Sequence, residues 1–456
     1  MIFNIPGYVK LIMNRLEEKG YTAYIVGGSI RDMLLDKTPS DYDIATNALP
    51  DNIEDIFSDM KRFNVGKKFG TIVISQEEGD VEVTTFRVDG NYIDGRRPEE
   101  VSFSSNIIDD LSRRDFTINA MAYNYNTGII DPYNGREDLK NKIIRTVGDS
   151  GARFKEDYLR ILRAARFSTQ LDFTIEKSTF DAGKKYGQNI SKISMERITA
   201  EFFKILLCEK PSNGIRIMED MEILNIVLPE IIPAIGFEQK NPHHEWDVYN
   251  HLLCVLDNTP PIIQVRLAAL FHDIAKPYTL SIDENGIGHF YGHDKIGAEI
   301  SKDILKRFKC SNELIEKVYI FVKEHMNHHT NFKEKGIKRL IRRVGEDEIF
   351  NLIALQKADI KCSNKNASID HIIEREKEIK DILDNKEAYE INQMAIDGRD
   401  LIELGFEEGK IIGEILEYLL EKVMENPELN NKDNLKKMAL DFKNLTEGQG
   451  CCDIIP

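Results

Sequence analysis

The chain has 456 residues, 41% of them hydrophobic and 30% charged, and its net charge is −16 at pH 7. A chain of this length is too long to fold around a single hydrophobic core, so we expect two or more domains. The composition excludes an intrinsically disordered protein. The acidic balance also excludes a uniformly basic protein that coats nucleic acid, although it allows a local basic groove.

The hydrophobic segments and the cysteines of the sequence indicate in which cell compartment the protein is expected. No apolar run approaches the roughly 18 to 20 residues that cross a bilayer, and the first residues lack the cationic and apolar segments of a secretory signal. The six cysteines show no metal-ligand spacing. We therefore expect reduced thiols, a cytoplasmic protein and no membrane partner.

Residues 1 to about 145 have an α/β pattern. An amphipathic helix with the apolar residues Val9, Leu11, Ile12 and Leu16 precedes several short apolar runs typical of strands. The expected strands cover residues 24–26, 42–44, 70–74 and 81–86. From Arg153 the pattern becomes helical and stays so nearly to the end.

The first 242 residues contain no histidine, because all ten histidines lie between His243 and His371. Any chemistry in the amino-terminal half must therefore proceed without an imidazole base, nucleophile or ligand. Catalysis there would have to use carboxylates, arginines and bound metal ions.

The first chemical motif is a glycine pair, Gly27 and Gly28, between an expected strand and an expected helix. Free backbone N–H groups at such a helix start form an anion site, and Ser29 is the expected N-cap. Asp41 and Asp43 follow on an expected strand, where alternate side chains project to the same face.

Two carboxylates beside an anion site suit Mg²⁺, which prefers hard oxygen ligands. Glu82, central on the strand expected at 81–86, is a candidate third carboxylate. Taken singly, the glycine pair is more often a plain turn and the two aspartates a solvated loop. Their combination in this order favours function.

Arg113 to Ala120 forms a second motif, in which arginine can clamp phosphate oxygens and Asp115 can accept a hydrogen bond from a ribose hydroxyl. Alone, such a run is usually exposed surface. Asp131 to Gly135 then has the composition of a turn.

A third motif is an expected helix over 156–167, on which Asp157, Arg160, Arg163 and Arg166 recur every three residues. Residues 140–166 carry eight basic and three acidic side chains. A salt-bridged surface helix is the plain alternative, but the excess of positive charge suits an anionic ligand. An aspartate and an arginine side by side also match the amino group and ring nitrogen of adenine and cytosine, and reject guanine and uracil.

Together, GGSIRD…DYDIAT, RRDFTINAMAY, DPYNGREDL and RFKEDYLRILRAARF resemble the class II tRNA nucleotidyltransferases, the CCA-adding enzymes, over roughly residues 24 to 168. The resemblance implies an α+β fold with a polymerase-β-like nucleotidyltransferase head of mixed sheet and helices. An extended all-α neck, an HD-type body and a tRNA-binding tail would follow. The implied ranges are 1–145 for the head, 146–240 for the neck with its template helix, 241–375 for the body and 376–456 for the tail.

The resemblance also implies roles for ten residues around one nucleotide. Asp41 and Asp43 would be catalytic and hold Mg²⁺, Gly28 and Arg31 would contact the triphosphate, Arg114 and Asp115 would grip triphosphate and ribose, Asp157 and Arg160 would read the base, and Arg163 and Arg166 would close the pocket. The helix from Met195 to Glu201 would give structural support.

The implied reaction is attack of a tRNA 3′-hydroxyl on the α-phosphate of CTP or ATP, with release of pyrophosphate. The segment 87–98 has the full length found in enzymes that add C, C and A, although addition of A alone stays an alternative. Poly(A) polymerases share the head, but they carry Arg-Phe-x-Leu-x-His where this chain has residues 66–71. No protein partner is evident.

In the histidine-rich half, His251, the pair His272 and Asp273, and Asp359 resemble the H…HD…D pattern of the HD superfamily. Such groups can bind a second divalent metal and activate water for phosphatase or 2′,3′-cyclic phosphodiesterase chemistry. A scaffold without metal is the plain alternative for this half. For the whole chain, a protein nucleotidylyltransferase with an HD hydrolase and a non-catalytic RNA-binding relic are competing hypotheses.

The tail carries Gly405, Gly409 and Gly413, which we expect on one face of a helix that another backbone can approach closely. The resemblance implies that this segment contacts the tRNA elbow. A packing seam of small residues is an equal alternative.

Overall fold

The computed structural model describes residues 3–90, 101–240, 246–329, 333–363 and 368–447. Contacts divide the chain into two units, unit 1 at Met1–Ile232 and unit 2 at Pro233–Pro456. Each unit is considered by itself below. Within the described ranges, no helix combines the length and the apolar character that a membrane span needs.

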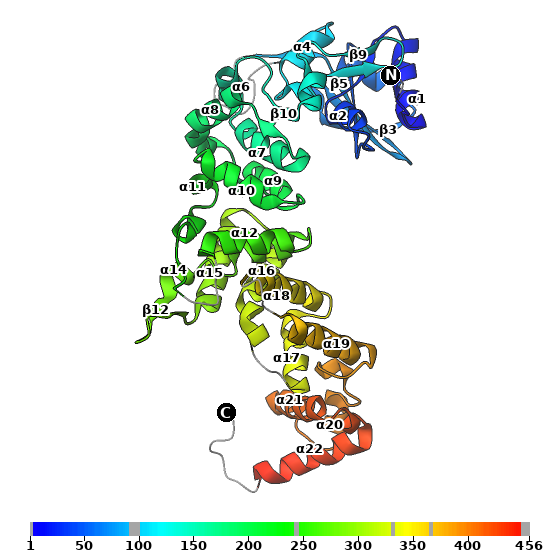
Figure 1. Cartoon of the computed structure of the whole chain (residues 1–456). Helices are drawn as coiled ribbons and strands as arrows, with labels where there is room; N and C mark the ends of the chain where they lie inside the picture. The colour runs from blue at the N-terminus through cyan, green and yellow to red at the C-terminus, as the bar shows by residue number, and fades with distance from the viewer. Residues whose placement is uncertain (1–2, 91–100, 241–245, 330–332, 364–367, 448–456) are drawn as a thin grey trace. The chain divides into compact units, whose positions relative to one another are not determined.

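Unit 1 contains a mixed seven-stranded sheet with the strand order β3-β4-β5-β2-β1-β8-β9. Three of its strands, β3, β5 and β9, are labelled in Figure 1. Neighbouring strands are antiparallel except β2 and β5, which are parallel. The strands are β1 (Ala23–Val26), β2 (Tyr42–Thr46), β3 (Lys61–Gly66), β4 (Thr71–Gln76), β5 (Gly79–Thr85), β8 (Ala122–Asn124) and β9 (Gly128–Ile130). The α+β fold class and the mixed sheet expected from the sequence are confirmed.

The two faces of this sheet are covered unequally. Ile25 and Ile44 face a large hydrophobic core, to which helix α1 (Gly7–Glu18) contributes its apolar face. Val26 and Ala45, the next residues on the same strands, face a much smaller apolar cluster. Because strand side chains alternate between faces, the polar residues of the central strands lie on the thinly covered side.

Helices supply the rest of unit 1. They are α2 (Gly28–Leu34), α3 (Pro50–Ile56), α4 (Ile107–Ser112), α5 (Gly135–Lys140), α6 (Ser150–Glu156), α7 (Leu159–Leu171), α8 (Lys177–Tyr186), α9 (Met195–Leu206), α10 (Pro211–Asp220) and α11 (Leu224–Val227). Two short ribbons pair β6 (Arg87–Asp89) with β7 (Val101–Phe103) and β10 (Ile143–Ile144) with β11 (Thr174–Ile175). Residues 91–100 fall outside the described ranges, so the expectation placed on segment 87–98 lies largely outside the described residues.

Two local expectations in unit 1 are wrong. The single helix expected over 156–167 is interrupted, because Asp157 has an extended backbone between α6 and α7. Its Oδ1 accepts a hydrogen bond at 3.1 Å from the backbone N–H of Leu159, the first residue of α7. The N-cap of α2 is Gly27 and not Ser29.

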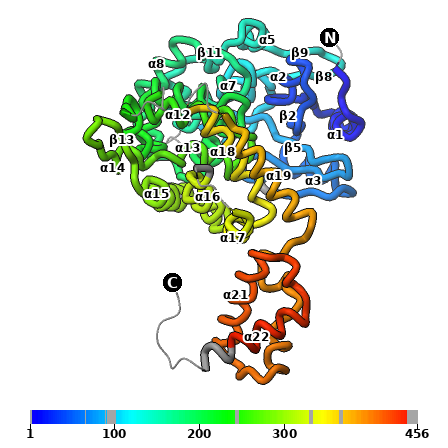
Figure 2. Tube along the Cα trace, turned by 60° about the horizontal axis from the view of Figure 1, so that its bottom comes forward, coloured from blue at the N-terminus to red at the C-terminus, as the bar shows by residue number. Residues whose placement is uncertain are grey.

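Unit 2 is helical apart from one hairpin, β12 (Leu280–Ile282) with β13 (Gly288–Phe290). Near the carboxyl end, α21 and α22 lie side by side (Figure 1 and Figure 2). The helices are α12 (Val248–Asn258), α13 (Ile263–Phe271), α14 (Lys276–Thr279), α15 (His293–Arg307), α16 (Asn312–Glu324), α17 (Glu334–Val344), α18 (Ile349–Ser363), α19 (Asp370–Asp384), α20 (Gly398–Glu403), α21 (Lys410–Glu425) and α22 (Lys432–Glu447).

The tail glycines do not form the expected helix face. Gly405 follows α20 and Gly409 caps the start of α21, and both have positive φ angles, +85° and +153°. Only Gly413 lies inside a helix. The first two therefore serve the turn between α20 and α21, where residues with a side chain would be strained.

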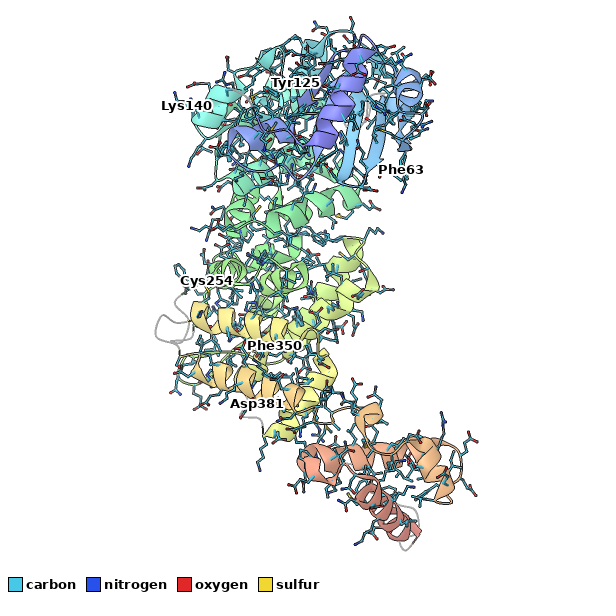
Figure 3. All side chains as sticks on the ribbon, turned by 90° about the vertical axis from the view of Figure 1, so that its right-hand side faces the viewer. Phe63, Tyr125, Lys140, Cys254, Phe350 and Asp381 are labelled. Atoms are coloured by element: carbon cyan, nitrogen blue, oxygen red, sulfur yellow. A yellow bond between two sulfur atoms is a disulfide. The ribbon has the colours of Figure 1, made fainter. Side chains whose placement is uncertain are left out.

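A disulfide joins α12 to α18 in unit 2. Cys254, labelled in Figure 3, is bonded to Cys362, and their Cα atoms are 5.8 Å apart. The expectation that all six cysteines are reduced thiols is therefore wrong for this pair. The two residues are separated by 108 positions, and only the packing of the two helices brings them together.

Candidate functional site

A pocket of about 750 Å³ in unit 1, called here the unit 1 pocket, collects most of the predicted site residues. It lies where α2, β2 and the segment after α4 meet α7 and the end of α9. Eight of the ten predicted residues line it, namely Gly28, Arg31, Asp41, Asp43, Arg114, Asp115, Arg163 and Arg166.

Acidic side chains gather at one wall of the pocket. Asp43 is on β2, in register with Glu82 on the neighbouring β5, and Asp41 directly precedes β2. Burial and the like charges of Glu82 and Asp41 raise the pKa of Asp43 to about 6, although Arg114 opposes them. Carboxylates that repel one another in this way form a place where a cation would be stabilised.

The glycine turn brings a guanidinium close to these acids. Gly27 has a φ of +72°, and a Cβ there would lie 2.8 Å from Arg114 Nη1. The backbone angle therefore favours glycine at this position, and a side chain there would also displace the end of Arg114. Ser29 Oγ donates a hydrogen bond to the carbonyl oxygen of Asp41 at 3.1 Å, which ties the turn to the start of β2.

Each arginine of the pocket is paired with an acid of unit 1. The nitrogen–oxygen distances are 2.8 Å for Arg31–Asp32, 3.1 Å for Arg114–Asp110, 2.6 Å for Arg163–Asp115 and 2.8 Å for Arg166–Glu201. The last three acids are buried. A guanidinium has five N–H donors, so one paired acid leaves donors for an anionic ligand.

Asp115 is more fully engaged than the sequence suggested. Its Oδ2 accepts from Arg163, and its Oδ1 accepts from Phe116 N at 2.8 Å and from Asn119 at 3.2 Å. Burial alone would raise the pKa of Asp115, but Arg163 and Arg160 outweigh burial and hold that pKa well below its usual range. The carboxylate thus fixes Arg163 as well as facing the pocket.

An aromatic ring lies among the arginines. The Phe167 centroid is 3.9 Å from the guanidinium carbon of Arg166 and 5.2 Å from those of Arg31 and Arg163. These distances are in the range of cation–π contact. Sequence reasoning missed this role, although Phe167 follows Arg166 directly and lies one turn after Arg163.

The structure does not place Asp157 and Arg160 among the lining residues. Asp157 Oδ2 is 2.7 Å from Arg197 Nη2 of α9. Arg160 bonds to Glu156 Oε2 at 2.5 Å and to the carbonyl oxygen of Arg113 at 3.0 Å. Asp157 lies just before α7 and Arg160 lies in its first turn, and the same helix carries Arg163 and Arg166 to the pocket.

The four residues of the predicted HD pattern converge in unit 2. His251 Nε2 is 3.1 Å from both His272 Nε2 and Asp359 Oδ1, and His272 Nε2 is 3.4 Å from Asp273 Oδ2. Burial by itself lowers the pKa of His272, but Asp273 and Asp359 outweigh it and raise that pKa to about 10. The carboxylates therefore require a positive charge here, which a proton or a metal cation would supply.

Two further histidines join this group and were not predicted as ligands. His293 Nε2 and His325 Nε2 lie 3.2 Å and 3.7 Å from Asp273 Oδ1. Spacing alone does not separate His293 from His289, which instead pairs with Asp283 at 3.0 Å. We call the six residues the histidine cluster: His251, His272, Asp273, His293, His325 and Asp359, all of them buried.

Family models match three parts of the chain. The head domain of poly A polymerase matches residues 23–145, the RNA and SrmB-binding site of polymerase A matches 172–235, and tRNA nucleotidyltransferase domain 2 matches 290–439. The CCA-adding enzyme of Pediococcus pentosaceus is 34% identical over 424 residues, which are 93% of this chain and 94% of that protein. The CCA-adding enzyme of Ligilactobacillus salivarius is 32% identical over 449 residues, 96% of this chain and 98% of that protein.

Solved structures of the same kind share the fold. The Bacillus stearothermophilus CCA-adding enzyme in complex with CTP aligns with a TM-score of 0.73 and 24% identity, covering 97% of this chain and 98% of that one. The Thermotoga maritima CCA-adding enzyme complexed with tRNA aligns with a TM-score of 0.59 and 22% identity, covering 96% and 95%. The similarity extends through both units.

We expect divalent cations to bind the Asp41–Asp43 wall more tightly as the pH rises through about 6, because Asp43 must first lose its proton and its pKa is raised to that value. Mn²⁺ binding can be measured by electron paramagnetic resonance between pH 4.5 and 8. The Asp43→Asn variant serves as the reference, since it removes only the titrating group. A binding difference between the two proteins that titrates near pH 4, the usual range of an aspartate, would contradict this expectation.

Proposed function

The chain belongs to the family of CCA-adding enzymes, and we propose that the unit 1 pocket is its active site. The protein adds C, C and A to the 3′ end of tRNA from CTP and ATP without a nucleic-acid template, and releases pyrophosphate. The observation that carries the site assignment is that Asp41, Asp43 and four arginines line one pocket.

Nucleotidyl transfer in this family depends on a metal. We assign Mg²⁺ to Asp41 and Asp43, because hard carboxylate oxygens suit this ion and because burial, together with the like charges of Glu82 and Asp41, raises the pKa of Asp43, so that a nearby cation would stabilise its charged form. Glu82, in register with Asp43, is placed to support the same ion. When bound, the metal lowers the pKa of the attacking hydroxyl and neutralises charge on the phosphate.

The arginines bind and orient the triphosphate in this proposal. Arg31 and Arg114 stand beside the glycine turn, and Arg163 and Arg166 approach from α7. Because acids already hold these guanidinium groups, they need little rearrangement when charge develops on the phosphates. The side chains thus provide positioning and charge compensation, which is the main work of a phosphoryl-transfer site.

Base choice is assigned to Asp157 and Arg160. Aspartate accepts a hydrogen bond from the amino group of cytosine or adenine, and arginine donates one to the neighbouring ring nitrogen. The Asp157–Arg197 and Arg160–Glu156 pairs must open for this to happen. Support comes from Arg160, which lies on α7 one turn before Arg163, and from Asp157, which lies two residues before α7 begins.

The comparisons do not favour a different activity for the chain. The two curated relatives compared above are both CCA-adding enzymes, not poly(A) polymerases or protein nucleotidylyltransferases. A non-catalytic relic is likewise disfavoured by the retained Asp41, Asp43 and Arg114. A cytoplasmic location is part of the proposal, since ATP, CTP and tRNA occur together there.

Asp41→Ala should lower nucleotide incorporation by at least about 100-fold, because it removes a proposed metal ligand. The assay supplies each labelled NTP to tRNA lacking CCA, to tRNA lacking only the final A, and to an RNA that is not tRNA. The control is Asp55→Ala, which removes an exposed acid of α3. Open-ended A-tails on any RNA would contradict CCA addition, and full activity of Asp41→Ala would contradict the site.

Asp157→Ala should reduce discrimination of CTP and ATP against UTP and GTP by about 10-fold or more, because the base loses one of its two matched partners. Single-nucleotide incorporation with each NTP measures the ratios. Glu196→Ala removes an exposed carboxylate next to Arg197, the present partner of Asp157, and should leave the ratios unchanged. Equal ratios in Asp157→Ala and the parent protein would remove Asp157 from base choice.

We propose a second activity for unit 2, metal-dependent hydrolysis of phosphoesters such as a terminal phosphate or a 2′,3′-cyclic phosphate of RNA. The geometry of the histidine cluster supports it, since imidazoles and carboxylates converge there as metal ligands do. We expect chelator-sensitive hydrolysis that His272→Ala abolishes while incorporation by the unit 1 pocket continues. If no hydrolysis is observed with Mn²⁺, Ni²⁺, Co²⁺ or Zn²⁺, the proposed hydrolytic activity of unit 2 is contradicted.

A further inference from the structure

Three exposed lysines of unit 1 lie against tyrosine rings. The ammonium groups of Lys155 on α6 and Lys185 on α8 are 5.1 Å and 5.4 Å from the centroid of one ring, that of Tyr186. The ammonium group of Lys192 is 5.6 Å from the centroid of Tyr158. In the part of the chain that the structure describes, none of these lysines pairs with a carboxylate. We call the five residues the lysine–tyrosine surface.

The helices that carry these lysines have an excess of positive charge. Helices α6 and α8 and the 3-10 helix η3 (Gly187–Lys192) carry six basic and two acidic side chains, although the net charge of the chain is −16. Both acids are already engaged, Glu156 with Arg153 at 2.8 Å and Asp181 with Lys177 at 3.3 Å. A local excess of this kind in an acidic protein favours an anionic ligand.

The Tyr186 ring holds two of the ammonium groups in place. Helices α6 and α8 pack side by side, so closely that a Cβ on Gly151 would lie 3.2 Å from the edge of this ring (Figure 1). The contacts of Lys155 and Lys185 with the ring are in the range of cation–π attraction. Because the two like charges lie near one ring and repel each other, an anion between them would be stabilised. The half-buried ring already carries both lysines, which favours a phosphate over a stacked base as the ligand.

The lysine–tyrosine surface is joined to the helix that lines the unit 1 pocket. Tyr158 directly precedes α7, and Arg163, which lines the pocket, follows about one helical turn after the start of α7. Both α6 and η3 contact α7. When the 3′ end of an RNA occupies the pocket, the phosphates that precede this end therefore lie near these helices.

We propose that the lysine–tyrosine surface binds the phosphate backbone of the double-stranded acceptor arm of tRNA and so places the 3′ end at the unit 1 pocket. This inference rests on the CCA-adding activity and on the active site assigned to the pocket. Phosphate contacts fix the position of a nucleic acid without reading its bases. The surface thus contributes tRNA affinity, whereas the pocket performs the nucleotidyl transfer.

The test compares two double variants that remove the same charge from unit 1. Lys155→Gln/Lys185→Gln alters the lysine–tyrosine surface. The control Lys177→Gln/Lys184→Gln removes lysines of α8 that pair with acids, at 3.3 Å and 3.0 Å. Anisotropy of labelled tRNA lacking CCA is measured over a range of KCl concentrations. In the first variant the slope of log affinity against log salt should become shallower by roughly two, and binding near 0.1 M KCl should weaken about 10-fold. The control should bind as the parent protein does.

Kinetics separate binding from chemistry. Lys155→Gln/Lys185→Gln should raise the KM for tRNA about 10-fold, while kcat and the KM for CTP stay those of the parent protein. Tyr186→Leu keeps both charges but removes the ring, so it should also raise the KM for tRNA, and Tyr186→Phe should restore it. Thermal unfolding checks that each variant is folded.

Equal tRNA affinity and equal salt slopes in Lys155→Gln/Lys185→Gln and the parent protein would overturn the proposal. An equal loss in the control would overturn it too, because net charge and not this surface would then determine binding. A hairpin that copies the acceptor arm should lose affinity for the first variant, and a single-stranded RNA with the same 3′ sequence should not; equal losses contradict the assignment to the double-stranded arm. A parent protein that does not extend tRNA would remove the CCA-adding activity itself, which none of the other outcomes does.

Discussion

The unit 1 pocket depends on guanidinium groups that buried acids hold in place. Arg114, Arg163 and Arg166 each meet a carboxylate that the fold has taken out of water. A buried acid without its arginine would be strongly destabilising, so the pairs can persist whether or not a ligand is present. The pairs are Arg114–Asp110, Arg163–Asp115 and Arg166–Glu201, and they join the segment after α4, helix α7 and helix α9 around one cavity. The binding surface is thereby organised before the nucleotide arrives.

The acidic wall could be predicted from the sequence because its parts are local. A glycine turn, a short strand and two aspartates in alternate positions lie within 17 residues, from Gly27 to Asp43. Both aspartates line the pocket as expected, although only Asp43 belongs to β2. Two of the arginine partners could not be predicted in the same way. Asp115 and Glu201 are far along the chain from Arg163 and Arg166, and Phe167 likewise meets Arg31 only through the fold of unit 1.

The interruption at Asp157 shows a different limit. The residues on both sides of Asp157 are helical, yet Asp157 itself has an extended backbone and its side chain accepts a hydrogen bond from Leu159 N. In unit 2, the order of His251, His272–Asp273 and Asp359 indicated four members of the histidine cluster. His293 and His325 carried no such signature, because their position depends on how α15 and α16 pack against the end of α13.

The bond between Cys254 and Cys362 has a consequence for that cluster. Cys254 follows His251 by three residues on α12, and Cys362 follows Asp359 by three residues on α18. Each sulfur therefore sits about one helical turn beyond a side chain of the cluster. Closing a loop across 108 positions removes about 4–5 kcal/mol of entropy from the unfolded chain. Thiol reductants would cleave this bond, and the His251 imidazole and the Asp359 carboxylate would then be kept together by helix packing and by their own 3.1 Å contact. The oxidation state of these two sulfur atoms thus determines whether α12 and α18 are covalently joined one helical turn away from the histidine cluster.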